Sequence, residues 1–313
     1  MEKINIVCAS DNGYISHCGA LIVSIFENNK SNKICVYVLT EDINFQNRKL
    51  LLKCASDYNQ EIEFVDIPVG IFNSYPMEVQ SLGYINYSTY YRLLIPELLP
   101  NLDKVIYLDC DMLVLADLSL LWDLNIEQYA IAGVKDALNN QVAAPARLGY
   151  DSHYSYFNAG MGVWNLDFLR RINFSEKVKD YVRKNYEKIQ FHDQDILNAI
   201  LFGFFLEVGM EWNLMGAFLR GKDFVIHSKE LECIKTPKII HFADVLKPWF
   251  KECDNPYKGL YWYYLGLTPW ANDKASYKYK LAKRILLYIK RYLKHILSLL
   301  GFRRYIQFNF NQN

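Results

Sequence analysis

The sequence has no Cys-x-x-Cys pair, although seven cysteines are spread over its 313 residues. An odd number of scattered thiols argues against a zinc site built from paired cysteines and against a disulfide framework. We therefore expect reduced cysteines, as is typical of a protein kept in the cytosol.

Long apolar runs and glycine-rich loops are also missing. No stretch approaches the roughly 18–20 apolar residues of a membrane-spanning helix, because the most apolar segment, 196–210, contains Asn198 and Glu207. The first apolar run is interrupted too early for a secretory signal, so we expect no signal peptide. Neither GxGxxG nor GxxxxGK[ST] occurs, which argues against dinucleotide and P-loop chemistry.

Negative charge is absent from the last forty residues. Residues 274–313 hold ten Lys/Arg and no Asp/Glu, which leaves 25 basic and 34 acidic residues in the first 273. The formal net charge of +1 therefore combines a body near −9 with a tail of +10. This asymmetry predicts a separate anionic partner for the tail.

The tail also has the pattern of an amphipathic helix. At about 100° per residue, residues 279–300 place most apolar side chains in one sector and Lys/Arg opposite, with Leu287 as the main exception. Because a helix packed on its own domain rarely lacks every acidic residue, we favour contact of residues 274–313 with an anionic membrane surface. A packed C-terminal helix is the alternative. We expect no nucleic-acid partner, since nucleic acid would leave the apolar face unexplained.

Composition and patterning together predict an α/β fold. Apolar residues make up 51% and charged residues 22%, which excludes a disordered or fibrous chain. The first part of the chain alternates strands and helices, which predicts a mostly parallel sheet covered on both faces. We expect strands at 4–9, 34–39, 62–67, 105–108, 130–134, 157–165 and 238–242. We expect helices at 20–27, 45–58, 89–99, 167–186, from about 193, and at 279–300.

Two carboxylates, Asp109 and Asp111, follow the apolar run 105–108. Because ligands of such sheets bind beyond the carboxyl ends of the strands, this pair should share a rim with residues 10–12. A turn after the strand would bring both carboxylates to one point, where they repel each other unless a cation joins them. Hard oxygen ligands suit Mg²⁺ or Mn²⁺. A solvated loop is the alternative interpretation.

Further candidate residues lie in three other patterns. His241 follows an apolar run and is a candidate metal ligand, and Lys247 is a candidate phosphate partner; a loop histidine and a surface lysine are the alternatives. Asp193 is suited to cap the helix that follows it, but capping leaves Gln194 unexplained. Arg92 lies in an apolar helical segment, so a carboxylate or a ligand should face it.

A fourth pattern places small residues after a polar one. Asn158 is followed by Ala159 and Gly160 in an apolar run. Small side chains let a backbone approach a ligand closely. A β-bulge is the alternative interpretation.

In this order, the patterns resemble the retaining glycosyltransferases of family 8, and among them the bacterial enzymes that add galactose or glucose to lipopolysaccharide. The resemblance spans residues 4 to about 250. The matching segments are 9–11 with Tyr14, 89–92, 107–114, 157–160, 193–198 and 241–249. Each segment is weak alone, whereas six in order are specific. Asp-x-Asp together with His-x₅-Lys-Pro-Trp is the most diagnostic pair.

The resemblance implies a GT-A fold, UDP-glucose or UDP-galactose as donor, and Mn²⁺, with Mg²⁺ as the second option. It implies that the uracil is contacted by Ala9 and Asp11 and stacked on by Tyr14. It implies metal binding by Asp109, Asp111 and His241, and diphosphate binding by Lys247. The donor sugar would be held by Arg92, Asp109, Asn158, Ala159 and Asp193. Gln194 would lie against the sugar face opposite the leaving group.

Retention of configuration requires either a nucleophile on that opposite face or same-face attack by the acceptor. The amide oxygen of Gln194 is a poor nucleophile. We therefore favour same-face attack, in which Gln194 stabilises the oxocarbenium-like carbon and the departing phosphate takes the acceptor proton. Asp193 as a covalent nucleophile is the less favoured catalytic role.

We therefore predict a retaining hexosyltransferase that acts on a lipopolysaccharide, glycolipid or surface-polysaccharide acceptor at the cytoplasmic face of the cell membrane. Its GT-A catalytic domain would cover 1–265 and its helical, basic membrane-association segment 266–313. One alternative is an Asp-x-Asp phosphohydrolase, although Leu113 stands where that class usually carries Thr or Val. Another is a non-catalytic membrane adaptor that retains the fold.

Two positions depart from the family pattern. Gly13 stands where the bacterial galactosyltransferases often carry Asn, and Asp244 stands where a Gly usually lets the backbone approach the diphosphate. A carboxylate beside a phosphate is unfavourable unless it points away. Nucleotide affinity is the property that these two departures affect.

Overall fold

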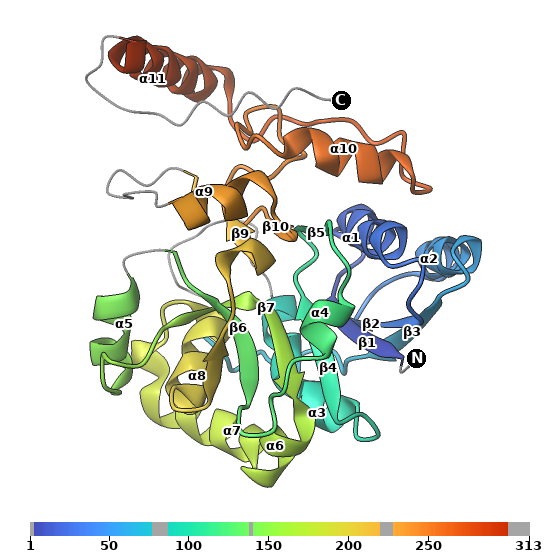
Figure 1. The fold of residues 1–313 in the computed structure, drawn as a ribbon, viewed down its shortest axis with the longest axis vertical. Helices are drawn as coiled ribbons and strands as arrows, with labels where there is room; N and C mark the ends of the chain where they lie inside the picture. Colours follow the sequence, from blue (N-terminus) through green and yellow to red (C-terminus); the bar gives the residue numbers. More distant parts are fainter. Residues whose placement is uncertain (1–2, 77–86, 138–139, 220–227, 300–313) are drawn as a thin grey trace.

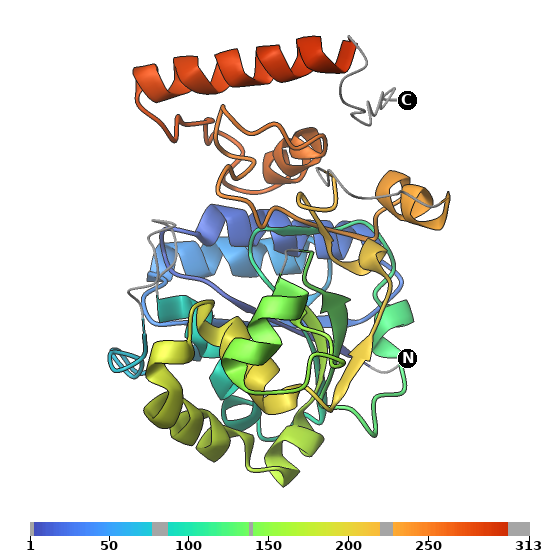
Figure 2. The same cartoon turned by 90° about the vertical axis from the view of Figure 1, so that its left-hand side faces the viewer.

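The computed structural model describes residues 3–76, 87–137, 140–219 and 228–299. In this part of the chain, helices cover both faces of a central sheet, and the C-terminal helices form one end of the molecule (Figure 1, Figure 2). The chain is therefore an α/β protein, as the alternating sequence pattern predicts.

In the part of the chain that the structure describes, seven strands form the central sheet, in the order β3-β2-β1-β4-β7-β6-β8. They are β1 (Ile4–Ala9), β2 (Ile34–Thr40), β3 (Glu61–Asp66), β4 (Lys104–Leu108), β6 (Ile131–Lys135), β7 (Phe157–Asn165) and β8 (Phe205–Glu207). Strand β1 pairs in parallel with β2 and β4, as does β2 with β3 and β6 with β8. Among these described strands, only β7 runs antiparallel to its neighbours, β4 and β6. The prediction of a mostly parallel sheet is confirmed.

A second, smaller sheet carries a distant segment to the rim of the first. Its order is β5-β10-β9, with β5 (Met112–Val114), β9 (Leu214–Met215) and β10 (Ile239–His241). Strand β10 pairs His241 with Met112 on one side and with Met215 on the other. This pairing places the predicted metal-binding histidine beside the turn that follows β4.

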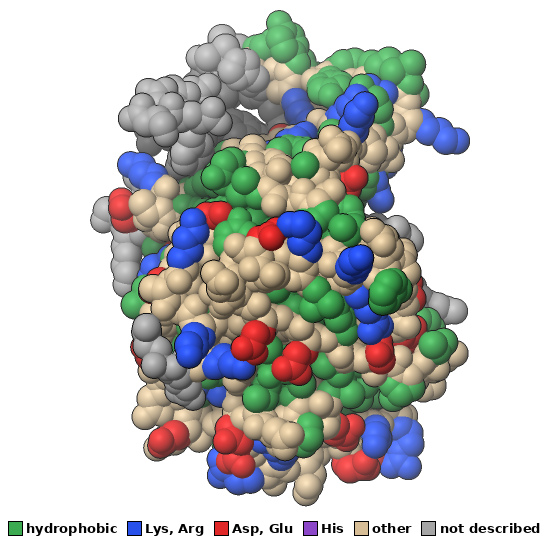
Figure 3. Space-filling view, turned by 90° about the vertical axis from the view of Figure 1, so that its right-hand side faces the viewer, with side chains coloured by type: hydrophobic (Ala, Val, Ile, Leu, Met, Phe, Trp, Pro, Cys, Tyr) green, Lys and Arg blue, Asp and Glu red, His purple; other side chains and the backbone are tan. Residues whose placement is uncertain are grey.

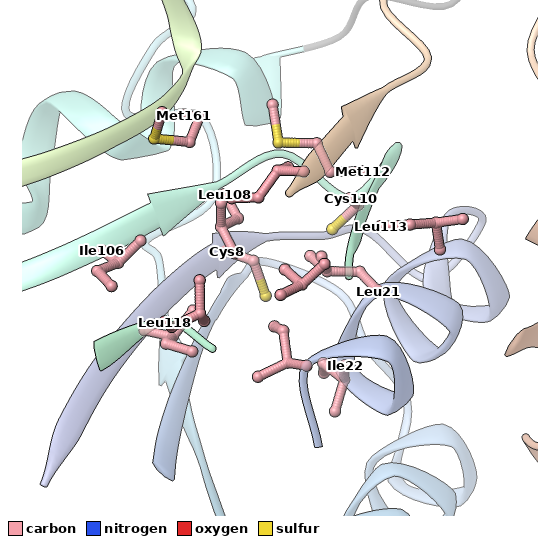
Figure 4. Close-up of a cluster of buried hydrophobic side chains, with 14 of the residues drawn as sticks. Cys8, Leu21, Ile22, Ile106, Leu108, Cys110, Met112, Leu113, Leu118 and Met161 are labelled. Atoms are coloured by element: carbon pink, nitrogen blue, oxygen red, sulfur yellow. The ribbon is translucent and has the colours of Figure 1, made fainter. Parts of the chain in front are cut away.

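Helices cover the two faces of the central sheet with separate hydrophobic cores. On one face, α1 (Ile15–Asn28), α2 (Phe45–Asp57) and α10 (Lys258–Gly266) pack over alternate β1 residues such as Ile6 and Cys8. Figure 4 shows Leu21 and Ile22 of α1 in this core. On the other face, Val7 packs with η1 (Tyr87–Leu94), α3 (Ile95–Leu98) and α8 (His192–Leu201). Burial on both faces explains why β2 is apolar almost throughout.

Two predicted helices are each divided in two. The helix expected at 89–99 is instead the 3₁₀ helix η1 followed by the short α3, because Pro96 has no N–H for an α-helical bond to Arg92. The helix expected at 167–186 is α6 (Leu166–Arg171) and α7 (Phe174–Asn185). Asn173 separates them with a left-handed φ of 54°. Further helical elements are α4 (Ser119–Trp122), α5 (Asn140–Leu148), η2 (Tyr186–Lys188), η3 (Met210–Trp212) and α9 (Ser228–Lys235).

Packing on the main body continues past the predicted boundary at 265/266. Helix α10 contacts α1, and Trp270 lies so close to α1 that a Cβ on Gly19 would be 2.7 Å from its ring. Farther along, Ser276 bridges to Phe250. The buried carboxylate of Glu252 then accepts hydrogen bonds from the backbone N–H groups of Lys278 and Tyr279. A separate membrane-association segment at 266–313 stays a prediction, and the packed body reaches Tyr279.

Helix α11 (Leu281–Leu299) is the outermost element in both ribbon views (Figure 1, Figure 2). Arg291 attaches it to the body through an ion pair with Asp254 at 2.9 Å. Exposed apolar residues on α11 are Leu281, Ile285, Leu286, Tyr288, Ile289, Tyr292 and Leu293. Figure 3 shows apolar and basic side chains next to one another at this end of the molecule. Within the described ranges, no helix is both long enough and apolar enough to cross a membrane.

Candidate active site

A turn after β4 and the end of β10 bring three potential metal ligands together. The backbone N–H of Met112 bonds to the carbonyl of Asp109, so the chain turns between the two carboxylates as predicted. Nε2 of His241 lies 3.3 Å from Oδ1 of Asp111 and 3.9 Å from Oδ2 of Asp109. One ligand atom from each of the three residues lies within 4.8 Å of the others. Two carboxylate oxygens and one imidazole nitrogen are a donor set that fits Mn²⁺ or Mg²⁺.

The two carboxylates have different electrostatic surroundings. Burial disfavours the charged form of Asp111, but Lys247 and His241 outweigh burial and hold its pKa below the usual range. The Lys247 ammonium donates to Oδ2 of Asp111 at 2.6 Å. Burial raises the pKa of Asp109, and the nearby Arg92 only partly offsets that effect. A divalent cation between the two carboxylates would favour the charged form of both.

Arg92 joins the metal-ligand cluster to the predicted sugar site. Its side chain is buried, and Nη2 lies 2.7 Å from Asp109 while Nε lies 3.0 Å from Asp193. Nη1 donates to the carbonyl of Ala159 at 2.6 Å. The prediction that a carboxylate faces Arg92 is confirmed by two carboxylates. Burial opposes the charge of Arg92, but Asp109 and Asp193 together raise its pKa.

Asp193 does not cap helix α8, so that structural interpretation is wrong. The N-cap residue is Phe191, which makes no side-chain capping bond. The Asp193 carboxylate instead pairs with Arg92 and accepts a hydrogen bond from the hydroxyl of Thr89. Its orientation follows from tertiary contacts with η1, which outweigh the local helix-end preference.

Asp195 holds the start of α8 in place. It is fully buried, and its carboxylate accepts hydrogen bonds from Arg147, the hydroxyl of Tyr156, and the backbone N–H groups of Gln190 and Phe191. His192 completes the sharp entry to the helix with a left-handed φ of 49°. This anchoring directs the two preceding side chains, Asp193 and Gln194, toward the cavity described below.

The amide orientation of Gln194 follows from its partners. Oε1 accepts from the backbone N–H of Ala159 at 3.0 Å and from Nδ2 of Asn158 at 3.1 Å. Nε2 donates to Asp136 at 3.0 Å. A backbone N–H can only donate and a carboxylate can only accept, so the carbonyl and amino ends of Gln194 are distinguished. Both lone-pair directions of the oxygen are thus engaged.

Gly160 lets β7 pass directly beneath the metal ligands. A Cβ at this position would lie 2.5 Å from Cε1 of His241 and 2.7 Å from Oδ2 of Asp109. At Gly160 the backbone of β7 thus lies against the side chains of the metal-ligand cluster, while the approach to a ligand expected at residues 158–160 stays a prediction. The β-bulge expected as the alternative is also present, because the pairing of β7 with β6 changes register between Phe157 and Gly162.

The predicted base-binding residues lie at the other side of the rim. Oδ1 of Asp11 accepts from the backbone N–H of Tyr14 at 2.7 Å, which shapes the entry to α1. Tyr14 packs edge-on against Trp249, and His17 stacks on the same indole with ring centroids 3.5 Å apart. The aromatic group holds the loop that carries Lys247 against α1.

Two residues that the sequence patterns missed belong to the same network. Asp136 follows β6 and bonds to Gln194. The rule that ligands bind beyond strand ends could have found it. Asn213 is completely buried and bonds to both His241 and Asn158. No local pattern marks Asn213, since its partners lie in β7 and β10.

All of the sequence-predicted site residues line one cavity of about 330 Å³. They are Ala9, Asp11, Tyr14, Arg92, Asp109, Asp111, Asn158, Ala159, Asp193, Gln194, His241 and Lys247. Asp136 and Asp244 also line it. The structure therefore brings the predicted residues together, while the role of each stays a prediction.

Comparison with known proteins identifies the family. The model of the family described as "Glycosyl transferase family 8" matches residues 5–253, which is most of the chain. The chain belongs to glycosyl transferase family 8. Family membership supports the glycosyltransferase prediction over the phosphohydrolase alternative.

Several relatives of this family 8 glycosyltransferase cover most of its length. General stress protein A of Bacillus subtilis is 32% identical over 86% of this chain and 95% of its own. The lipopolysaccharide 1,2-glucosyltransferase of Escherichia coli is 27% identical over 95% and 86% of the two chains. The galactosyltransferase LgtC, solved with donor and acceptor sugar analogues, aligns with a TM-score of 0.75 at 25% identity over 85% of this chain and 96% of its own. The glycosyltransferase therefore has the GT-A fold.

Proposed function

We propose that this glycosyltransferase moves a glucose or galactose from its UDP-sugar to a lipopolysaccharide or surface-polysaccharide acceptor, with retention of configuration. The observation that carries the proposal is that one cavity brings Asp109, Asp111 and His241 beside Lys247 and the Arg92–Asp193 pair. The cavity thus combines a cation site, a phosphate partner and polar groups suited to sugar hydroxyls. The names of the E. coli relative and of LgtC agree with this class of reaction.

The donor set of Asp109, Asp111 and His241 fits Mn²⁺, with Mg²⁺ as the second option. When bound there, the cation would neutralise charge on the diphosphate and favour its departure. Lys247 is buried beside Asp111 and would add a positive point charge on the same side of the leaving group. Together these charges would stabilise the UDP that departs.

The remaining residues would bind the rest of the donor. Arg92, Asn158, Ala159 and Asp193 border the part of the cavity beside the cation site, where the hexose would lie. Ala9 and Asp11 would contact the uracil, and Tyr14 would stack on it. Asp109 would contact both the cation and the sugar, because Arg92 pairs with Asp109 as well as with Asp193.

The geometry supports same-face attack by the acceptor. The oxygen of Gln194 already accepts two hydrogen bonds, which makes it a poorer nucleophile. As the negative end of the amide dipole, it would still stabilise positive charge on the sugar. Asp193 is likewise engaged through both oxygens, by Thr89 and Arg92. Neither side chain is therefore well suited to form a covalent intermediate. The departing phosphate would take the proton from the acceptor hydroxyl.

A screen of UDP-sugars for hydrolysis with added Mn²⁺ tests the proposed reaction. We expect cation-dependent release of UDP from UDP-glucose or UDP-galactose, and strong loss of release in Asp111→Asn and Lys247→Met. Absence of hydrolysis, with no protection by UDP against unfolding, would favour the non-catalytic adaptor. A glycosyl–Asp193 adduct seen by mass spectrometry would reverse the choice between same-face attack and a covalent intermediate.

We further propose that residues 274–313 attach the enzyme peripherally to the cytoplasmic face of the cell membrane. The support is the exposed apolar side of α11, with Ile285, Ile289 and Tyr292 each about half or more exposed, next to basic residues. Anionic headgroups would add on the order of 1 kcal/mol for each Lys or Arg near the surface. Such attachment would bring the active site to a lipid-linked acceptor.

Vesicle sedimentation tests the attachment. The chain should be truncated after Lys280, because Ser276, Lys278 and Tyr279 contact the body and their removal would expose Glu252. We expect the truncated chain to lose binding to anionic vesicles and to keep UDP-sugar hydrolysis. A full-length variant with Ile285 and Ile289 changed to Ser is the matched control for the apolar contribution. Undiminished vesicle binding by the truncated chain would refute the attachment.

A further inference from the structure

One continuous chain of side-chain hydrogen bonds links the metal-ligand cluster to the sugar site. Nδ1 of His241 lies 2.9 Å from Oδ1 of Asn213, and Nδ2 of Asn213 donates to Oδ1 of Asn158 at 2.9 Å. Nδ2 of Asn158 in turn donates to Gln194 at 3.1 Å. The residues come from β10, the end of η3, β7 and α8. In the described part of the chain, buried Asn213 bonds directly to both His241 and Asn158.

The backbone N–H of Gly160 fixes the donor and acceptor of each hydrogen bond between His241, Asn213 and Asn158. The N–H of Gly160 can only donate, and it bonds to the Asn158 amide at 3.1 Å, so that atom is the carbonyl oxygen. The Asn213 atom that faces the same oxygen must therefore be its amino nitrogen. This assignment turns the carbonyl oxygen of Asn213 toward His241. Because that oxygen can only accept, Nδ1 of His241 carries the hydrogen.

The tautomer places the free lone pair of His241 where a cation needs it. With the hydrogen on Nδ1, the lone pair is on Nε2, which lies 3.3 Å from Asp111 and 3.9 Å from Asp109. Metal-binding histidines commonly donate their other ring N–H to a partner that fixes the ring and the tautomer. His241 and Asn213 are almost fully buried, so water does not readily replace this partner.

We infer that Asn213 is a positioning residue that couples the cation site to the donor-sugar site; the inference rests on the function proposed above. Its carbonyl oxygen holds His241 in the metal-binding tautomer. Its amino group holds Asn158, which donates one of the two hydrogen bonds that the Gln194 oxygen accepts. One residue thus contributes to both halves of the site through opposite ends of a single amide.

Two substitutions separate the two ends. Asn213→Ala removes both bonds, and we expect Mn²⁺ binding, measured by electron paramagnetic resonance of the free ion, to weaken about 10- to 100-fold. Asn213→Asp keeps an oxygen toward His241 and places a second oxygen against Oδ1 of Asn158. That variant should retain Mn²⁺ binding but lose kcat for UDP-sugar hydrolysis, because only the branch to Gln194 is broken.

Asn165→Ala is the matched control. Asn165 is a buried asparagine at the opposite end of β7 that bonds to the carbonyl of Ile126 and the N–H of Phe168. Its replacement should lower the melting temperature without changing Mn²⁺ binding. A purely structural role for Asn213 predicts that all three variants lose stability and that none changes Mn²⁺ affinity selectively.

The outcomes distinguish this inference from the proposed function. If the wild-type chain binds Mn²⁺ and folded Asn213→Ala binds it equally well, the coupling role of Asn213 is refuted while the cation site stands. If Asn213→Ala does not fold, parallel losses of Mn²⁺ binding and kcat in Asn213→Asp would refute the separation of the two ends. A wild-type chain that binds no divalent cation would refute the proposed cation site itself.

Discussion

Replacing Gly160 by alanine tests how tightly the metal ligands pack on β7. The added Cβ would lie 2.5 Å from Cε1 of His241, whereas ordinary van der Waals contact begins at 3.4 Å, so the imidazole must retreat by about 0.9 Å. Oδ2 of Asp109, at 2.7 Å from the same point, must also move. Metal–ligand distances tolerate only about 0.2 Å. The substitution should therefore disrupt cation binding rather than merely crowd the strand.

We expect Gly160→Ala to lower UDP-sugar hydrolysis about 100-fold, the loss that accompanies a displacement of about 1 Å in an active site. Mn²⁺ binding, measured without substrate, should weaken in parallel. Overpacking should cost about 1–3 kcal/mol in the free energy of unfolding, measured by urea denaturation. The chain should therefore remain folded at low urea concentration.

Gly162→Ala provides a matched control on the same strand. A Cβ there would lie 2.7 Å from Cδ1 of Ile131, which is a core side chain and not a metal ligand. We expect a similar loss of stability with Mn²⁺ binding close to that of the wild type. Wild-type Mn²⁺ affinity in folded Gly160→Ala would refute the argument, because it would show that His241 and Asp109 adjust without cost.

Three further predictions concern the surroundings of the site. Burial lowers the pKa of His17 to about 3. Below about pH 6.5 the unfolded chain therefore protonates His17 while the folded chain does not. The free energy of unfolding should fall by up to about 1.4 kcal/mol per pH unit as the solution is acidified. His17→Phe keeps a ring against Trp249 and should remove this slope in urea denaturation between about pH 6.5 and pH 4; an unchanged slope would place its origin elsewhere. Gly19→Ala should destabilise the wild type, where the Cβ meets Trp270 at 2.7 Å, but stabilise a Trp270→Ala background by up to about 1 kcal/mol through helix propensity. If thermal denaturation shows that Gly19→Ala changes stability in the same direction in the wild type and in Trp270→Ala, the packing of Trp270 on α1 is contradicted. Asp244→Gly should tighten UDP binding in a calorimetric titration, because Asp244 lines the cavity; equal affinity would show that its carboxylate does not face the diphosphate.

Much of the architecture follows from local sequence features. The strands expected at 4–9 and 157–165 agree with β1 and β7 because an apolar run bounded by polar residues identifies a strand buried on both faces. The helices expected at 89–99 and 167–186 were wrong in detail. In each, one residue, Pro96 or Asn173, changes the backbone within an otherwise helical pattern.

The candidate site was predictable in its members and not in their arrangement. The rule on strand ends placed Asp109 and Asp111 on the rim, and the cost of burying an unpaired guanidinium required a carboxylate near Arg92. The same rule could have found Asp136. It could not find Asn213, because that residue acts only through two partners that are remote in sequence.

The sequence by itself determined the α/β class, the family resemblance, the carboxylate pair and the charge asymmetry of the tail. These depend on composition and on spacing within short segments. The tertiary structure alone decided that His241 pairs opposite Met112, that Gly160 must remain without a side chain, and that Asn213 orients His241. Strand register and hydrogen-bond direction depend on contacts between segments that are far apart in the chain. A single sequence does not show which of these segments are in contact.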